Sequence, residues 1–261
     1  MKKTTKQKLR RAILYLVFVL AVVLFAVLAD WGQIQTSFFN LDVAAEMLPR
    51  VFTVAAKNTI VYTFTAFSFG LVLALVLALM KRSEIRPYRW VANSYIELFR
   101  GLPALVTIIF VAYGLPIALD IRIPGGLLGQ GTVGLGLVAA AYMAETLRAG
   151  IEAVPRGQME AARSLGMSRG AAMRSIVLPQ AFRIIIPPLT NELVLLIKDT
   201  SLFFVLGSTP VNKELTKFGR DLMTQKFNAT PLVVIALVYL IITLPLTRLV
   251  AQLEKRAARA R

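Results

Sequence analysis

The residues of this chain that could do chemistry interrupt an apolar stretch, NELVLLIKDTS at 191–201. They are Asn191, Glu192, Lys198 and Asp199. In a helix, residues seven positions apart share a face, so Glu192 lies on the same face as Asp199. Asn191 and Lys198 share a second stripe, about 100° away from the first. Two carboxylates, an ammonium group and an amide in this arrangement could bind a charged or zwitterionic solute.

Lys198 would lie deep in the membrane if this stretch crosses one. It follows Pro187 by 11 residues, or about 16 Å of helix, which places it near the middle of a hydrocarbon core about 30 Å thick. Lys198 and Asp199 are adjacent, so they do not neutralise each other within the helix. An ionisable side chain at this depth is costly unless it is hydrated or paired, and it marks a functional site by default. An interhelical salt bridge that only fixes packing is the alternative.

Two further pairs of charges lie beside apolar stretches. Glu145 and Arg148 are three residues apart, a spacing that lets them pair on one helix face, and we interpret them as a structural pair. Glu97 and Arg100 precede a Gly-x-Pro sequence at 101–103, where a helix can break and leave backbone groups lining a cavity. Glu97 and Arg100 are therefore candidates for the inner gate of a transport path. In the alternative, Arg100 only extends to the lipid headgroups.

Composition indicates which elements must position these side chains. Hydrophobic residues make up 57% of the 261 positions, against roughly 45–50% in soluble domains. The chain has neither cysteine nor histidine, so we assign no catalytic residue and no metal ligand. Several near-uncharged stretches approach the ~20 residues needed to cross a bilayer. We expect an all-α membrane protein of about six transmembrane helices, at about 12–29, 54–80, 101–119, 132–150, 180–207 and 230–252.

The distribution of basic residues predicts the topology. Four segments hold 22 of the 30 lysines and arginines: 1–11, 81–100, 148–183 and 248–261. Basic loops face the cytoplasm in membrane proteins, so both termini are predicted to be cytoplasmic. The net charge of +16 therefore reflects topology, and no nucleic-acid partner is expected. The basic segment 208–229 is an exception, and it could form a short amphipathic helix that lies on the outer surface or meets an external partner.

A second notable segment, EAARSLGMSRGAAMRSIVLP at 160–179, predicts two helices joined by a tight corner between two spans. Strong helix formers open it, and Gly166 follows where a helix can end on a left-handed residue. Ser168 can cap the next helix by accepting a backbone N–H at its start. Ala161 and Ala162 leave a shallow surface on which another protein could close without steric conflict.

The spacing within this segment resembles a known motif. Glu-Ala-Ala at 160–162, Gly166 and Ile-Val-Leu-Pro at 176–179 match the E-A-A-x3-G-x9-I-x-L-P loop of permease subunits of ATP-binding cassette importers. The motif has several fixed points at fixed intervals, so a chance match is improbable. The structural alternative is an ordinary cytoplasmic helical hairpin.

Further residues resemble the polar amino acid branch of that family, the histidine, glutamine and glutamate type. YIELFRGLP at 95–103 is similar to its Y-x-E-x-F-R-G-T-P box, with Leu102 where threonine is more usual. The sequences at 139–168 and 178–202 are similar to the branch as well. The resemblance covers about residues 51–255, and the N-terminal span is its main departure.

The resemblance implies a five-helix type I importer core with one additional N-terminal helix, in a bacterial cytoplasmic membrane. The helix in the 160–179 loop would be a coupling helix that docks into a cleft of a cytoplasmic ATPase. Its coupling residues would be Glu160, Ala161, Ala162, Gly166 and Ser168. The partners would be a second permease subunit, identical or homologous, two ATPase subunits, and an external solute-binding protein that delivers a polar amino acid.

ATP hydrolysis is expected in the ATPase subunits and not in this chain. A G-x-x-x-x-G-K-[ST] loop is absent from the sequence, because GGLLGQGT at 125–132 lacks the lysine that contacts the phosphates. ATP and its Mg²⁺ would therefore belong to the partner, and this chain would need no cofactor of its own. We expect 125–132 to form an external turn between two spans.

These expectations combine into one mechanism. Residues 1–50 form a basic tail, a first span and an external linker, 51–255 form the permease domain, and 256–261 form a basic cytoplasmic tail. ATP binding would close the ATPases, move the coupling helices and open the path outward by alternating access. The path would be lined by Asn191, Glu192, Lys198, Asp199, Glu97 and Arg100.

Two other functional classes are weighed against this mechanism. A secondary transporter driven by an ion gradient through Glu192 and Asp199 would explain the charges within the membrane. It would leave the 160–179 segment without a role. A scaffold protein without transport activity is the third possibility.

Overall fold

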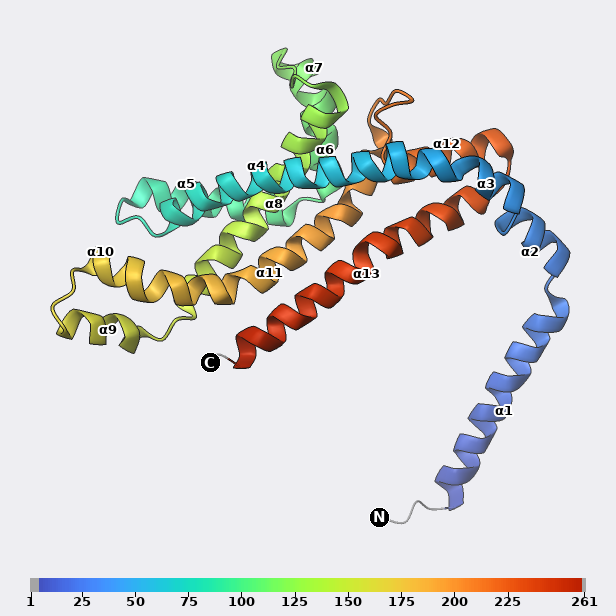
Figure 1. Ribbon diagram of the computed structural model, residues 1–261, viewed down its shortest axis with the longest axis horizontal. Helices are drawn as coiled ribbons and strands as arrows, with labels where there is room; N and C mark the ends of the chain where they lie inside the picture. Colours follow the sequence, from blue (N-terminus) through green and yellow to red (C-terminus); the bar gives the residue numbers. More distant parts are fainter. Residues whose placement is uncertain (1–4, 260–261) are drawn as a thin grey trace.

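The computed structural model describes residues 5–259, and within that range the chain folds into helices without strands (Figure 1). Residues 1–4 and 260–261, which belong to the predicted basic tails, lie outside the described residues. Five helical segments are long and apolar enough to cross a membrane, and a bent helix pair could provide a sixth crossing. The predicted all-α membrane fold with about six spans is confirmed.

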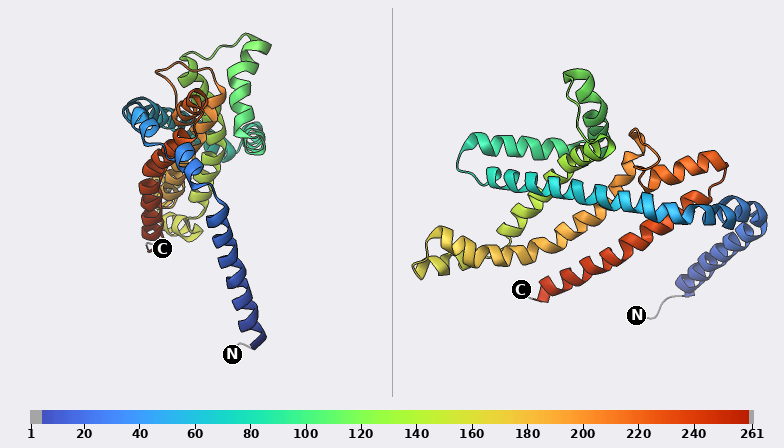
Figure 2. Two further views of the ribbon diagram at one scale, coloured as in Figure 1. Left: turned by 90° about the vertical axis from the view of Figure 1, so that its right-hand side faces the viewer. Right: turned by 45° about the horizontal axis from the view of Figure 1, so that its top comes forward.

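The elements follow one another along the chain with short connections. In order they are α1 (Thr5–Leu28), α2 (Trp31–Phe38), α3 (Leu41–Arg50), η1 (Val51–Ala56), α4 (Lys57–Lys81), α5 (Arg86–Gly101), α6 (Ala104–Ile109), η2 (Phe110–Gly114), α7 (Leu115–Leu119), α8 (Gly126–Glu152), α9 (Arg156–Ser164), α10 (Arg169–Ala172), η3 (Met173–Val177), α11 (Leu178–Asp199), η4 (Thr200–Val205), α12 (Leu215–Lys226) and α13 (Thr230–Arg259). Figure 2 shows that α9 and α10 lie at one end of the molecule and that α2, α3 and α12 lie at the other.

The first span stands apart from the other helices. Every position of α1 from residue 7 to residue 28 is exposed, and Figure 2 shows α1 extending away from the rest of the chain. The expected linker after it is folded as α2 and α3, because Asp30 and Asn40 cap these two helices through backbone N–H groups. The linker is held to the turn before α13, where the Ala229 N–H donates to the Ser37 carbonyl at 2.8 Å.

The core lies where α4, α8 and α11 pack together, and small residues set the distance between α4 and α8. A Cβ added to Gly70 would lie 3.0 Å from the Gly136 carbonyl oxygen, and a Cβ on Gly136 would lie 2.5 Å from the Phe69 ring. The two glycines therefore allow close contact between the helix backbones, the packing that small residues provide between membrane helices. This contact fixes the position of α8, which lines the site described below.

The glycine-rich stretch at 125–132 differs from its prediction as an external turn. It forms the first turns of α8, which begins at Gly126 and not near residue 132. Gly125, with φ of +87°, still ends the preceding turn. Gly131 is required for packing, since a Cβ there would lie 2.4 Å from the Phe203 ring. The glycines therefore serve helix contacts, which local sequence alone does not distinguish from a turn.

The predicted break at 101–103 is present between α5 and α6. Their axes, with α6 extended through α7, are bent by 108°. Leu102 is extended and Pro103 is the residue before α6, so the second half of the pair starts at Ala104. This bend brings the end of α5 and the start of α6 against α8.

The short helix predicted within 208–229 is also present, as α12. Glu214 caps it by accepting the N–H groups of Thr216 at 2.5 Å and Lys217 at 2.6 Å. Glu214 is fully buried, and the Tyr239 hydroxyl of α13 donates to it at 3.4 Å. A second, smaller apolar cluster joins α12 and α13 to α3 and η1 beneath this cap.

Candidate functional site

Two cavities adjoin where α5, α6, α8 and α11 meet. The first has a volume of about 390 Å³ and is lined by the start of α6, by apolar residues of α8, and by Glu192 and Asp199 of α11. We term it the carboxylate cavity. Glu192 and Asp199 are each half-buried and open into this one space, as their spacing of seven residues predicts. The two carboxyl groups thus give an otherwise mainly apolar cavity an acidic lining.

The second cavity has a volume of about 430 Å³ and a predominantly polar lining. We term it the arginine cavity. Its polar side chains are those of Lys81, Asn93, Glu97, Arg100, Tyr142 and Glu145. Glu97 and Arg100, the predicted gate residues, therefore lie together in one cavity, and both are exposed to it. Exposure of these charges within a hollow avoids the cost of placing them in lipid.

Tyr142 of α8 lines both cavities. The Arg100 guanidinium carbon lies 5.6 Å from the centroid of its ring, within the range of a cation–π interaction. This aromatic side chain was not among the predicted site residues. Its spacing from Glu145, three positions along the same helix, is the signal that could have indicated it, because residues three apart share a helix face.

The other polar stripe of α11 is placed differently. Asn191 and Lys198 are exposed, and neither lines the carboxylate cavity or the arginine cavity. They lie on one face of α11, and within the described residues no other element buries them. The structure therefore separates the four polar residues of α11 into two pairs with different surroundings.

A charged network closes one side of the arginine cavity. The Lys81 ammonium lies 2.9 Å from Glu145 Oε2, which ties α4 to α8. Arg148 forms ion pairs with both Glu145 and Glu152 on α8. The predicted pair of Glu145 with Arg148 is thus confirmed as part of a larger network, whose third and fourth members sequence reasoning did not identify.

The segment between α8 and α11 forms the corner that its sequence predicts. α9 ends at Ser164, and Gly166, just after the capping residue Leu165, has a φ of +84°. The Gly166 N–H donates to the Arg163 carbonyl at 3.0 Å and the Met167 N–H donates to the Ala162 carbonyl at 3.2 Å, the bond pattern of a Schellman motif. Ser168 Oγ accepts the Ala171 N–H at 3.2 Å and caps α10.

The exposed surface of α9 differs from the prediction at two positions, Ala162 and Leu165. Glu160 and Ala161 are exposed, but Ala162 is only 5% exposed and packs within the loop. Leu165, which was not singled out from the sequence, is 85% exposed at the end of the helix. An uncovered leucine beside the small side chain of Ala161 leaves an apolar surface on a helix that is otherwise polar.

Comparison with known proteins places this arrangement in a family. Residues 70–259 match the family described as binding-protein-dependent transport system inner membrane component. The probable glutamine ABC transporter permease protein GlnM of Bacillus subtilis (strain 168) is 37% identical over 207 residues, which are 76% of this chain and 89% of that protein. The arginine transport system permease protein ArtQ of the same organism is 35% identical over 219 residues, 83% and 97% of the two chains.

Solved structures agree with this assignment. A crystal structure of an amino acid ABC transporter with histidines contains a chain that is 36% identical, with a TM-score of 0.74 over 82% of this chain and 96% of that one. An inward-facing structure of the methionine ABC transporter MetNI shares the fold at 20% identity, with a TM-score of 0.62 and coverage of 77% and 93%. The chain belongs to the inner-membrane components of binding-protein-dependent transport systems, the permease subunits of ATP-binding cassette importers.

Proposed function

We propose that this permease carries a polar amino acid and that the two cavities hold it on its way through the membrane. The adjacency of the cavities at Tyr142 is the observation that supports this proposal. The α-ammonium group would be attracted to Glu192 and Asp199, and the α-carboxylate to Arg100. The relatives named for glutamine and for arginine transport agree with a substrate of this class.

A second permease subunit would complete the path. Asn191 and Lys198 are exposed on α11, beside the carboxylate cavity but outside it. We place them opposite the second subunit, identical or homologous, where water or the partner's polar groups would remove the cost of charge at mid-depth. Lys198 would then meet the substrate where the path runs between the two subunits, outside the two cavities.

The helix α9 would couple this path to the ATPase subunits. Glu160 and Ala161 are on its exposed surface, while Ala162, Gly166 and Ser168 hold the corner that orients it. Two ATPase subunits with ATP and Mg²⁺ would dock at this end, which would be cytoplasmic together with both termini. The external binding protein would approach the opposite end, where α12 lies.

Residues 51–255 would form the permease domain, and α1 would lie outside it, since α1 is exposed along residues 7–28. The other two helices of residues 1–50, α2 and α3, pack against α13 and would join the permease domain. Residues 256–259 are the last residues of α13 and would lie on the cytoplasmic side.

Uptake into proteoliposomes that contain the complete importer, with its ATPase and binding protein, tests the substrate class. The probes are radiolabelled L-glutamine, L-glutamate and L-arginine. We expect uptake of at least one, dependent on ATP inside the vesicles and insensitive to an uncoupler. Failure of all three would contradict the substrate class, and collapse with an uncoupler would favour an ion-gradient mechanism.

Neutral variants of the acidic pair then test the cavity. In Glu192→Gln and Asp199→Asn we expect KM to rise by about ten-fold or more, since a hydrogen bond to a charged group contributes about 1.5–3 kcal/mol. Asp120→Asn is the matched control, because Asp120 is exposed on the loop after α7 and lies outside both cavities. An unchanged KM in both cavity variants would show that the acidic pair does not contact the substrate.

A further inference from the structure

The arginine cavity differs from the carboxylate cavity in the signs of its charges. Two basic residues, Lys81 and Arg100, and two acidic residues, Glu97 and Glu145, line the arginine cavity. Among the described residues, the carboxylate cavity has acidic residues on its lining but no basic one. A lining with both signs of charge can pair with both ends of a zwitterion, such as the α-ammonium and α-carboxylate groups of an amino acid.

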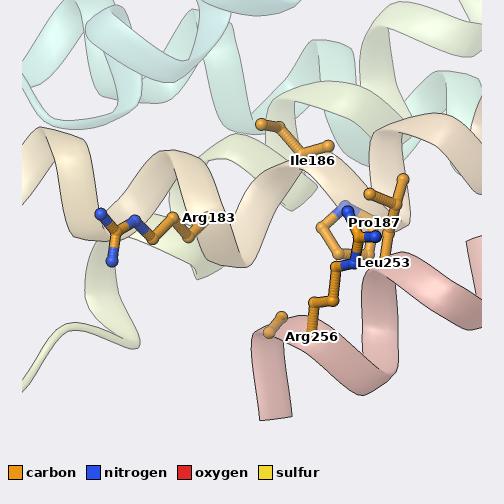
Figure 3. Close-up of a pocket in the computed structure, with 6 residues that line it drawn as sticks. Arg183, Ile186, Pro187, Leu253 and Arg256 are labelled. Carbon is orange, nitrogen blue, oxygen red and sulfur yellow. The ribbon is translucent and has the colours of Figure 1, made fainter. Parts of the chain in front are cut away.

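A third hollow shows that arginines alone do not provide such a lining. It has a volume of about 300 Å³, lies between α11 and α13, and is mostly apolar. Figure 3 shows the guanidinium of Arg256 beside Pro187, while Arg183 extends along α11. No acidic residue of the described part of the chain lines this hollow. Of the three hollows described here, the arginine cavity is therefore the one that combines the two signs.

Within the arginine cavity, one charge of each sign is free to bind a ligand. The Lys81 ammonium is paired with Glu145 at 2.9 Å. Glu97 and Arg100 form no ion pair in the part of the chain that the structure describes, and both side chains are exposed. They lie three residues apart on α5, so they share one face of that helix. One ligand can therefore contact both groups.

Tyr142 orients Arg100 without neutralising it. The centroid of its ring lies 5.6 Å from the guanidinium carbon. A cation–π contact of this kind leaves guanidinium N–H groups able to donate to a carboxylate. Arg100 is therefore held in place and still available to a ligand.

The wall of the arginine cavity is connected to the predicted coupling helix α9. Glu145 pairs with Arg148, and Arg148 pairs with Glu152, the last residue of α8. Residues 153–155 then lead to α9, and Val154 among them is only 6% exposed and packs in the main apolar core. A ligand that displaces this wall would therefore change the orientation of α9.

We propose that the arginine cavity is an exit site for the zwitterionic backbone of an amino acid, where amino acid accumulated in the cytoplasm binds and slows the importer. The site would face the cytoplasm, since Lys81 and α5 belong to the segment 81–100, whose basic residues predict that side. The α-carboxylate would stay on Arg100, while the α-ammonium would pass from the acidic pair of the carboxylate cavity to Glu97. The inference rests on the proposed function, because it takes the two cavities as successive positions on one path.

Binding to the permease–ATPase complex in nanodiscs, without the binding protein, tests the site. The probe is L-alanine, whose side chain is only a methyl group, and saturation-transfer difference NMR detects it. We expect L-alanine to bind. L-Alaninamide, which lacks the carboxylate, and N-acetyl-L-alanine, which lacks the ammonium group, should each bind about ten-fold more weakly, because each loses one charged partner.

A pair of double variants locates the bound probe. In Glu97→Gln/Arg100→Gln the L-alanine signal should be lost. Glu84→Gln/Arg86→Gln removes the same two charges at exposed positions near the start of α5, outside the cavity, and should keep the signal.

Proteoliposomes that contain the complete importer test the inhibition. Initial uptake of radiolabelled L-glutamine, L-glutamate or L-arginine is measured with increasing L-alanine in the lumen, relative to the rate of the same variant without it. The half-inhibitory concentration of L-alanine should rise about ten-fold in Glu97→Gln. It should stay within about two-fold of wild type in Glu84→Gln and in Glu192→Gln.

Each part of the proposal can fail separately. Absence of L-alanine binding, or a signal that survives in Glu97→Gln/Arg100→Gln, would overturn the site. Equal binding of all three probes would overturn recognition of a zwitterion. Binding without inhibition from the lumen would overturn the regulation, and an equal shift in Glu192→Gln would place the inhibition in the carboxylate cavity. If uptake of all three amino acids fails while L-alanine still binds at Glu97 and Arg100, the substrate class is wrong and the site stands.

Discussion

The guanidinium of Arg100 lies over the ring of Tyr142, with 5.6 Å between the guanidinium carbon and the ring centroid. The contact joins the end of α5 to the middle of α8 across the arginine cavity. Because Tyr142 also lines the carboxylate cavity, a movement of α5 that displaced this ring would change the lining of both cavities. We propose that this stacked pair, and not a salt bridge, forms the inner gate of the path.

Loss of this stacking should weaken transport. In Tyr142→Leu we expect KM for the transported amino acid to rise about three- to ten-fold, because a cation–π contact contributes about 0.5–2 kcal/mol. Tyr142→Phe keeps the ring and should behave like wild type. Uptake kinetics in proteoliposomes provide the measurement. Equal KM values for the leucine and phenylalanine variants would show that stacking of Arg100 on the ring does not contribute to KM.

The corner at Gly166 should require a residue that accepts a positive φ. Gly166→Val should lower ATPase activity stimulated by the binding protein several-fold, because a left-handed conformation costs an ordinary residue about 1–2 kcal/mol. No atom lies within 4 Å of a Cβ at this position, so the effect would come from the backbone alone. Gly166→Asn should retain most activity, since asparagine visits this region more readily.

Gly170→Val is the matched control for that corner. Gly170 also has open space around its Cβ, but it has ordinary helical backbone angles in α10. ATPase stimulation in Gly170→Val should stay close to the wild-type level. A loss equal to that of Gly166→Val would mean that bulk, and not the left-handed turn, decides coupling.

The sequence predicted the parts of the fold that depend on local patterns. Hydrophobic length located the spans, and the glycine and serine spacing located the corner at Gly166 and Ser168, because helix caps act within a few residues. The glycine-rich start of α8 was misassigned, because Gly131 is required by its packing against the Phe203 ring, which lies about seventy residues away in the chain.

The candidate site was likewise predictable from the sequence only where it depends on spacing along one helix. Helical spacing put Glu192 with Asp199, and the structure opens both into one cavity. Tyr142 was missed because its role depends on Arg100 of another helix, which the packing of α5 against α8 brings over its ring. The exposure of Leu165 and the burial of Ala162 likewise follow from how the loop packs on itself, and composition does not indicate either.

The close contact of Gly70 and Gly136 should govern stability. In Gly136→Val the new side chain would meet Phe69 and the Ala66 carbonyl, and such overpacking costs about 1–3 kcal/mol. We expect a lower Tm of the purified protein in detergent. Gly157→Val, at a position with open space, should leave Tm nearly unchanged. An unchanged Tm in Gly136→Val would show that the helices can separate at no cost.

The buried cap of α12 should make stability depend on pH. Burial raises the pKa of Glu214 from its ordinary 4.5 to about 7, although the N–H groups of Thr216 and Lys217 favour the charged form. A carboxyl with a raised pKa in the folded state stabilises the fold fully below about pH 4.5, and this contribution is lost as the pH rises through about 7. The Tm of wild type should therefore fall from about pH 5 to about pH 8 relative to that of Glu214→Gln.

Glu254→Gln controls for the loss of an acidic group elsewhere. Glu254 is exposed on α13, and its variant should show the same pH dependence of Tm as wild type. A difference between wild type and Glu214→Gln that does not change over this pH range would mean that Glu214 keeps its charge throughout.

The coupling role of α9 is the central claim, and accessibility of a single thiol tests it most directly. The chain contains no cysteine, so Ala161→Cys introduces one thiol on the exposed face of α9, and Asp120→Cys introduces one after α7 as the comparison. Membrane-impermeant maleimide should label Ala161→Cys in inverted vesicles only, and the ATPase should suppress that labelling. Asp120→Cys should be labelled in right-side-out vesicles, with or without ATPase. Labelling of Ala161→Cys from the outside, or labelling that the ATPase leaves unchanged, would contradict the account.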